Sequence, residues 1–203
     1  QHYSRFRAVA QVLKLALGLL WDPIDPHALL QFLIHPAGPL PVYERSKLAA
    51  AVAREPGIGG HAWQEALAAI EERLGTRQGK TSREIAPAVA EIRYWLENPR
   101  YDAGAGAPLA VVIERAQRCS TWLARKLHAA DENDSELDLY AAARAQAEAL
   151  IAALGDLLAQ GADTIPRIVL ERLVDEVSAH AADPATFAQS RHVRAATLPG
   201  AIT

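Results

Sequence analysis

Apolar residues recur every three to four positions along most of the chain, which is the period of an α-helix with one buried face. In the first such stretch, over residues 4–21, Leu13, Leu17 and Leu20 fall on the same side of the predicted helix. The same period predicts further helices over residues 25–34, 42–55, 61–74, 81–96, 109–127, 136–160 and 164–177. No alternating run is long enough to build a sheet. The pattern therefore predicts an all-α fold, an irregular multi-helix bundle of about eight helices.

Capping residues mark where several of these helices begin. Asp25 followed by Pro26 is typical of an N-cap with proline in the first helical turn. Thr81 with Glu84 three residues later has the form of a capping box. Pro87 falls inside the helix that follows, where we expect it to remove a hydrogen bond and bend the axis.

The helical pattern extends over residues 1–190, which we expect to form one domain with a possible subdivision near the proline- and glycine-rich stretch 97–108. A last short helix is expected from Asp183. Residues 191–203 have no helical period and are predicted to be a non-helical C-terminal tail that leads toward the next domain of a parent protein. The first residue is Gln1 and no Met occurs, which suggests a piece of a longer chain.

Composition narrows the classes of function. Half of the 203 residues are apolar, which is enough for a substantial core, and the formal net charge is only −3. Such a balance marks neither a strongly basic nucleic-acid binder nor an acidic tail, so any binding must use local patches. The longest apolar run, over residues 15–21, falls far short of the roughly 20 residues that cross a bilayer. With a single cysteine and no signal peptide, a cytoplasmic protein without a membrane span is expected.

The segment over residues 75–81 resembles a nucleotide-binding loop. Gly75, Gly79, Lys80 and Thr81 resemble a phosphate-binding loop, but three residues separate the glycines where that loop has four. The segment also follows a predicted helix, whereas a phosphate loop follows a strand so that its amides converge on the nucleotide. A helix connector is the favoured interpretation, and no cofactor is predicted.

Metal and catalytic sites are likewise not predicted. The acidic loop over residues 131–136 alternates polar side chains as a calcium loop does, yet Glu136 stands where such loops need glycine. The histidines have no metal-ligand spacing. Cys119 lies near the edge of an apolar stripe, which favours a buried, inert thiol. We therefore expect no catalytic residue in this chain.

The loop over residues 56–60 is the sharpest local signal. Its glycines would let the backbone approach a partner, and free amides at the start of the next helix can hold an anion such as a DNA phosphate. The same residues would equally make a tight turn between helices, with Ile58 inserted in the core. The candidate contact residues at this loop are Arg54, Gly57, Ile58, Gly59, Gly60 and His61.

A basic strip with an aromatic residue inside it is predicted on the helix over residues 109–127, opposite its apolar stripe. Such a strip would neutralise phosphates while its tryptophan stacks on a base or packs on a sugar. Alternatively, the tryptophan packs under a neighbouring element and the arginine stems cover it. The strip comprises Arg115, Arg118, Trp122, Arg125 and Lys126.

Three short stretches resemble a known family. The sequence Arg-Glu-Pro-Gly-Ile-Gly-Gly at 54–60 resembles the Gly-Ile-Gly loop in the second inserted helical subdomain of superfamily-one helicases of the UvrD and RecB type. Leu-Trp-Asp-Pro-Ile-Asp-Pro-His-Ala-Leu-Leu at 20–30, with Phe-Leu-Ile-His-Pro at 32–36, is similar to the helical region of AddB-like helicase-nuclease proteins of bacterial double-strand-break repair. The ending at 192–200 resembles the approach to the next motor motif.

The resemblance implies a non-catalytic helical accessory domain that contacts the duplex DNA backbone or the neighbouring motor and nuclease domains. It implies a parent that is an ATP-dependent helicase and PD-(D/E)XK exonuclease-like protein, although neither the ATP-binding motif nor the nuclease residues occur here. The chain departs from the family where basic or hydroxyl residues often follow the turn, because Gly60, His61 and Ala62 stand there. The alternative is a protein-interaction or packing module that does not bind DNA. Such a module would contact other domains of the parent or a partner subunit.

Overall fold

The structure is a computed structural model that describes residues 2–76, 81–129 and 137–181. Within these residues the all-α prediction is confirmed. The helices are α1 (His2–Gly18), α2 (Pro26–Ile34), α3 (Val42–Arg54), α4 (His61–Thr76), α5 (Ser82–Leu96), α6 (Leu109–Ala129), α7 (Leu137–Ala159) and α8 (Arg167–Ala181). The predicted helix from Asp183, the tail, the acidic loop over 131–136 and the Gly79-Lys80 pair lie outside the described residues.

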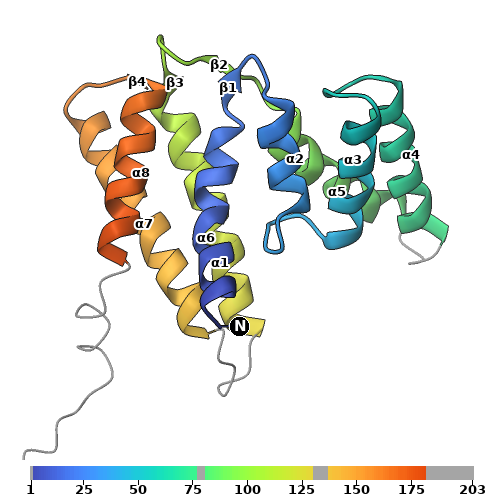
Figure 1. The fold of residues 1–203 in the computed structure, drawn as a ribbon, viewed down its shortest axis with the longest axis horizontal. Helices are drawn as coiled ribbons and strands as arrows, with labels where there is room; N and C mark the ends of the chain where they lie inside the picture. Colours follow the sequence, from blue (N-terminus) through green and yellow to red (C-terminus); the bar gives the residue numbers. More distant parts are fainter. Residues whose placement is uncertain (1, 77–80, 130–136, 182–203) are drawn as a thin grey trace, which may run out of the picture.

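The helices form two side-by-side groups (Figure 1). α1, α6, α7 and α8 pack together in one group, with the most extensive contact between α6 and α7. The other group is a series in which α2 packs on α3, α3 on α4 and α4 on α5. Since α1 also contacts α2, the first helix of the chain joins the two groups.

One hydrophobic core runs through both groups. Its buried side chains come from every described helix, and its largest include Trp63 on α4, Phe32 on α2 and Trp95 on α5. The rings of Phe32 and Trp95 lie 6.3 Å apart between their centroids. From the stretch 97–108, Ala107 belongs to this core, and Tyr101 and Ala103 pack against it partly buried.

Two very short strand pairs fasten that stretch to both groups. β2 (Tyr101–Asp102) pairs in parallel with β1 (Trp21–Asp22), and β3 (Ala107–Pro108) pairs antiparallel with β4 (Thr164–Ile165). Gly106 makes the second pair possible, because a Cβ there would lie 2.7 Å from the Ile165 carbonyl carbon. The connector thus holds the α1–α2 junction and the α7–α8 junction together.

The predicted caps are confirmed. Asp25 accepts a hydrogen bond from the His27 amide at 2.8 Å, at the start of α2. At the start of α5, the carboxylate of Glu84 accepts hydrogen bonds from the amide and the hydroxyl of Thr81, at 2.9 and 2.8 Å. Pro87 lies within α5, which continues through it. Among the described helices, none is both long enough and apolar enough to cross a membrane.

Candidate nucleic-acid interface

The glycine loop between α3 and α4 is a tight turn anchored in the core. Gly57 and Gly59 have φ values of +125° and +86°, a region of backbone conformation that favours glycine. Ile58 between them is half-buried and packs against the main core. The structure thus agrees with the interpretation in which this isoleucine anchors a turn between two helices.

The start of α4 already holds a carboxylate of the same chain. Glu55 follows the last residue of α3, and its Oε2 accepts a hydrogen bond from the Ala62 amide at 2.9 Å. A Cβ at Gly60 would lie 2.2 Å from Glu55 Oε1, so this glycine is what lets the carboxylate approach. The carboxylate therefore occupies the position where the first amides of α4 would bind a phosphate.

The two candidate cationic residues at the loop face a second carboxylate. Arg54 Nη2 forms an ion pair with Glu65 Oε2, and His61 Nε2 lies 3.1 Å from Glu65 Oε1. All three side chains are exposed, so each contact contributes little to stability. Glu55 and Glu65 thus place two carboxylates beside the loop, against the one guanidinium group of Arg54.

The predicted basic strip on α6 is wrong in its geometry. Arg115 and Trp122 are only 1% and 5% exposed, so neither belongs to a surface strip. Trp122 packs in a small second core cluster, with its ring edge-on to Tyr140 at 6.4 Å between centroids. The reason is that α6 is covered by α1, α5 and α7, so its buried arc is wider than its aliphatic stripe.

Arg115 instead ties together the C-terminal ends of two helices. Its Nε donates to the Ala16 carbonyl at 2.9 Å, in the last turn of α1, and its Nη2 donates to the Trp95 carbonyl in the last turn of α5. Carbonyls of a last turn lack intrahelical donors and carry the negative end of the helix dipole. Burial lowers the pKa of Arg115 to about 10, which leaves it charged at neutral pH.

Two further arginines cap helix ends in the same manner. Arg45, which is buried, donates to the carbonyl of His35, the C-cap of α2. Arg100 donates to the carbonyl of Leu96 at the end of α5, at 2.6 Å. Burial lowers the pKa of both arginines below the ordinary value. Three arginines of this chain thus direct their guanidinium groups at backbone carbonyls.

The other members of the predicted strip lie at the surface. Arg118 stacks on the Tyr94 ring, 3.6 Å from its centroid, and pairs with Glu91 and Glu114 at 3.1 and 3.3 Å. Arg125 and Lys126 are exposed, and neither has an ion-pair partner within the part of the chain that the structure describes. Of the five strip residues, the structure therefore leaves these two available to a phosphate.

The acidic partners are the residues that sequence reasoning missed. The spacing of Glu114 and Arg118, four residues apart on one helix, was a readable signal. Glu91 lies on a different helix from Arg118, and Glu55 reaches α4 only because of the turn at the glycine loop. No sequence pattern indicates those two contacts.

The described residues contain no group of His, Cys, Asp and Glu side chains that could hold a metal ion. Cys119 is 1% exposed, and burial raises the pKa of its thiol to about 12. It is therefore a protonated core thiol at neutral pH and a poor nucleophile.

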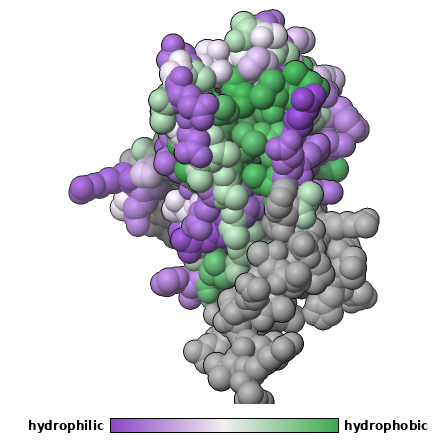
Figure 2. Space-filling view, turned by 90° about the vertical axis from the view of Figure 1, so that its left-hand side faces the viewer, coloured by the Kyte–Doolittle hydropathy of each residue, from purple (hydrophilic) through white to green (hydrophobic). Residues whose placement is uncertain are grey.

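The outer face of α7 and α8 carries apolar side chains at the surface. Figure 2 shows apolar surface gathered on this side of the molecule between hydrophilic edges. The large hydrophobic side chains exposed on these two helices are Leu158 at 44% on α7, and Ile168 at 64% and Val169 at 44% on α8. Large apolar side chains gathered on one exposed face are typical of a surface that contacts another protein.

Comparison with known proteins assigns no family to these features: no protein-family model, no curated protein and no solved structure matches the chain.

Proposed function

We propose that this chain is a non-catalytic helical accessory domain of a bacterial DNA-repair helicase-nuclease of the AddB-like or UvrD/RecB-like type. We propose further that it works by packing against protein, either other domains of its parent or a partner subunit. The resemblance of residues 20–36 and 54–60 supports the first part. An all-α fold is what that resemblance leads one to expect.

The observation that carries the second part is the charge around the glycine loop. The Glu55 carboxylate accepts a hydrogen bond from the Ala62 amide, and the Glu65 carboxylate contacts both Arg54 and His61. A DNA phosphate would have to displace one carboxylate and would meet repulsion from the other. Duplex binding through this loop is therefore disfavoured, and the apolar face of α7 and α8 favours a protein neighbour.

Fluorescence-anisotropy titrations test the choice between DNA and protein. We expect labelled duplex and single-stranded DNA to show no salt-dependent binding to the wild-type chain between about 50 mM and about 200 mM salt. The Glu55→Gln, Glu65→Gln double variant, which removes both carboxylates, is expected to gain weak duplex binding. Steep salt-dependent duplex binding by the wild type, lost in Arg54→Gln, would instead establish the loop as a DNA contact.

Thiol labelling in the full-length parent protein tests the packing directly. A cysteine introduced at Ile168 is expected to be protected from a maleimide in the parent and reactive in the isolated chain. A cysteine at Arg125 is the matched control, since this position is exposed and lies on α6 rather than on α7 or α8, and it should react in both. Equal reactivity at position 168 in the parent and in the isolated chain would contradict packing through this face.

A further inference from the structure

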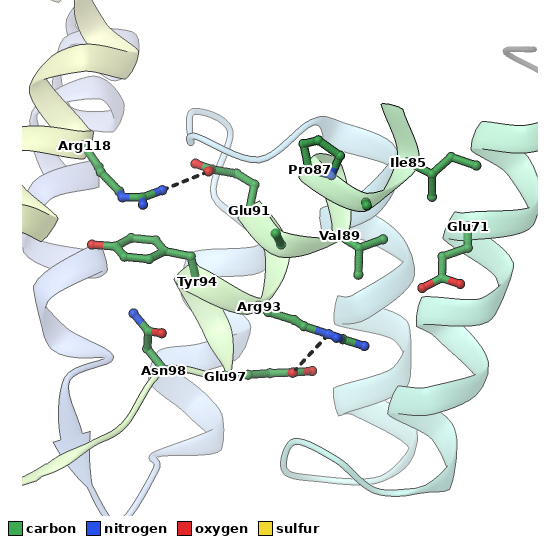
Figure 3. Close-up of a pocket in the computed structure, with 12 residues that line it drawn as sticks. Glu71, Ile85, Pro87, Val89, Glu91, Arg93, Tyr94, Glu97, Asn98 and Arg118 are labelled. Atoms are coloured by element: carbon green, nitrogen blue, oxygen red, sulfur yellow. Dashed lines mark hydrogen bonds and ion pairs between the residues drawn. The ribbon is translucent and has the colours of Figure 1, made fainter. Parts of the chain in front are cut away.

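A groove runs over the outer face of α5, between α4 and α6 (Figure 3). Its volume is about 960 Å³. Ala86, Pro87 and Ala90 are exposed along its floor and have short side chains, so another element can approach the α5 backbone closely. Tyr94 and Arg118 close the end next to α6.

The charges that line this groove are unequal. They comprise three carboxylates, of Glu71, Glu91 and Glu97, and two guanidinium groups, of Arg93 and Arg118. Both guanidiniums have partners, since Arg118 lies 3.1 Å from Glu91 and Arg93 lies 3.6 Å from Glu97. Glu71 on α4 is exposed and makes no hydrogen bond or ion pair with any described residue. The surplus charge is thus a single carboxylate at the α4 wall.

A segment that binds in this groove must form its backbone hydrogen bonds within itself. The floor of the groove is a helix whose amides and carbonyls bond one another, apart from the one bond that Pro87 removes, so it offers no row of free backbone groups to an extended strand. A helical partner meets this condition and fits a floor of small side chains. Nucleic acid does not suit the groove, because its lining carries a net negative charge.

We propose that the α5 groove binds an α-helix of a partner protein that presents small and apolar residues to the floor and a lysine or arginine to Glu71. This inference rests on the proposed function as a protein-packing domain, and it names the site and the chemistry of one partner. The groove lies on a different side of the molecule from the apolar face of α7 and α8, so the two surfaces can be occupied together.

A display library tests the proposal, with helical peptides of about 20 residues randomised along one face as the probe and the wild-type chain as bait. Selected helices are expected to combine an apolar stripe with a lysine or arginine at a fixed position. Their affinity should fall about fivefold for Glu71→Lys, as expected for one partly exposed ion pair. It should fall about tenfold or more for Ala90→Arg, which fills the floor.

Glu72→Lys is the matched control, because Glu72 is exposed on the same helix but does not line the groove. It should leave the affinity unchanged, and circular dichroism should show each variant folded. The proposal is overturned if no helix is selected, if the selected helices bind Ala90→Arg as well as wild type, or if they show no preference for a cation. The DNA titrations are independent, so a failure of the groove alone leaves the proposed function intact.

Discussion

At the scale of single residues, the contact between Glu55 and the start of α4 depends on one missing side chain. Gly60 is not in a positive-φ conformation, so its backbone would accept alanine. An added Cβ would lie 2.2 Å from Glu55 Oε1, so alanine fits only if this flexible carboxylate moves away. The role of Gly60 is therefore to leave room for the Glu55 carboxylate, and not to adopt a backbone conformation that the turn requires.

A double-mutant cycle between these two residues is expected to show strong coupling. Gly60→Ala alone should cost about 1 kcal/mol in the free energy of unfolding, because it displaces the carboxylate that caps α4. In a Glu55→Ala background the same change should cost close to nothing, since the colliding group is gone. Urea denaturation of the four proteins measures the coupling.

Gly155→Ala provides the control for this cycle. Gly155 lies inside α7 with nothing within 4 Å of an added Cβ, so alanine there should stabilise the chain by up to about 1 kcal/mol. If the effects of Gly60→Ala and Glu55→Ala simply add, the carboxylate is not what Gly60 accommodates.

The sequence predicts helix caps whose residues lie next to the helix start, but it does not predict the cap that Glu55 provides for α4. Asp25 and Thr81 precede their helices by a fixed offset, so the cap follows from spacing alone. Glu55 lies seven residues before Ala62, and its reach depends on the two positive-φ glycines between them. The acidic character of the candidate site could therefore not be predicted before the turn geometry was known.

At the scale of helices, arginine side chains replace the usual glycine cap at several C-terminal ends. Arg115 serves α1 and α5 at once, and it has no carboxylate among its hydrogen-bond partners in the described structure. The two helix ends supply the compensating negative potential. Position and charge are both needed, because a shorter or neutral side chain cannot reach both carbonyls as a donor.

Replacing Arg115 by methionine is expected to destabilise the chain by about 3 kcal/mol or more, since two buried carbonyls would lose their donors. Arg125→Met on the same helix is the control and should change stability by less than about 0.5 kcal/mol, because that side chain is exposed. Chemical denaturation monitored by circular dichroism makes the comparison. Similar losses in the two variants would refute the capping role.

The misplacement of Arg115 and Trp122 in the predicted strip has a cause at this same scale. Periodicity identifies the aliphatic side of a helix, and α6 has that side as expected. It cannot reveal that a helix is covered on a second side, as α6 is by α5 and α7, and arginine and tryptophan are residues that tolerate such burial when their donors find partners. Element type was thus predictable here and the exposed face was not.

At the scale of the whole molecule, the continuous core predicts one cooperative unfolding transition. Cys119 reports on it, because this thiol is buried in α6 within the main core and burial raises its pKa. We expect Ellman's reagent to leave the native chain unreacted and to modify Cys119 only as urea unfolds it. The labelling midpoint should coincide with the midpoint from circular dichroism.

Labelling well below the dichroism midpoint would contradict that expectation. It would mean that the α1, α6, α7 and α8 group opens separately from α2 to α5, and that the connector over 97–108 is a boundary after all. The two strand pairs that fasten this connector argue for a single transition.

The place of α1 also sets the order in which a ribosome can deliver a finished fold. Among the eight described helices, α1 precedes all the others in the sequence, yet it packs on α6, α7 and α8, which come after the rest. α2 to α5 can stack as they appear, since each contacts the next along the chain. Beyond its contact with α2, the apolar side of α1 stays unpaired until α6, α7 and α8 are made, and during that interval a nascent-chain chaperone can bind it.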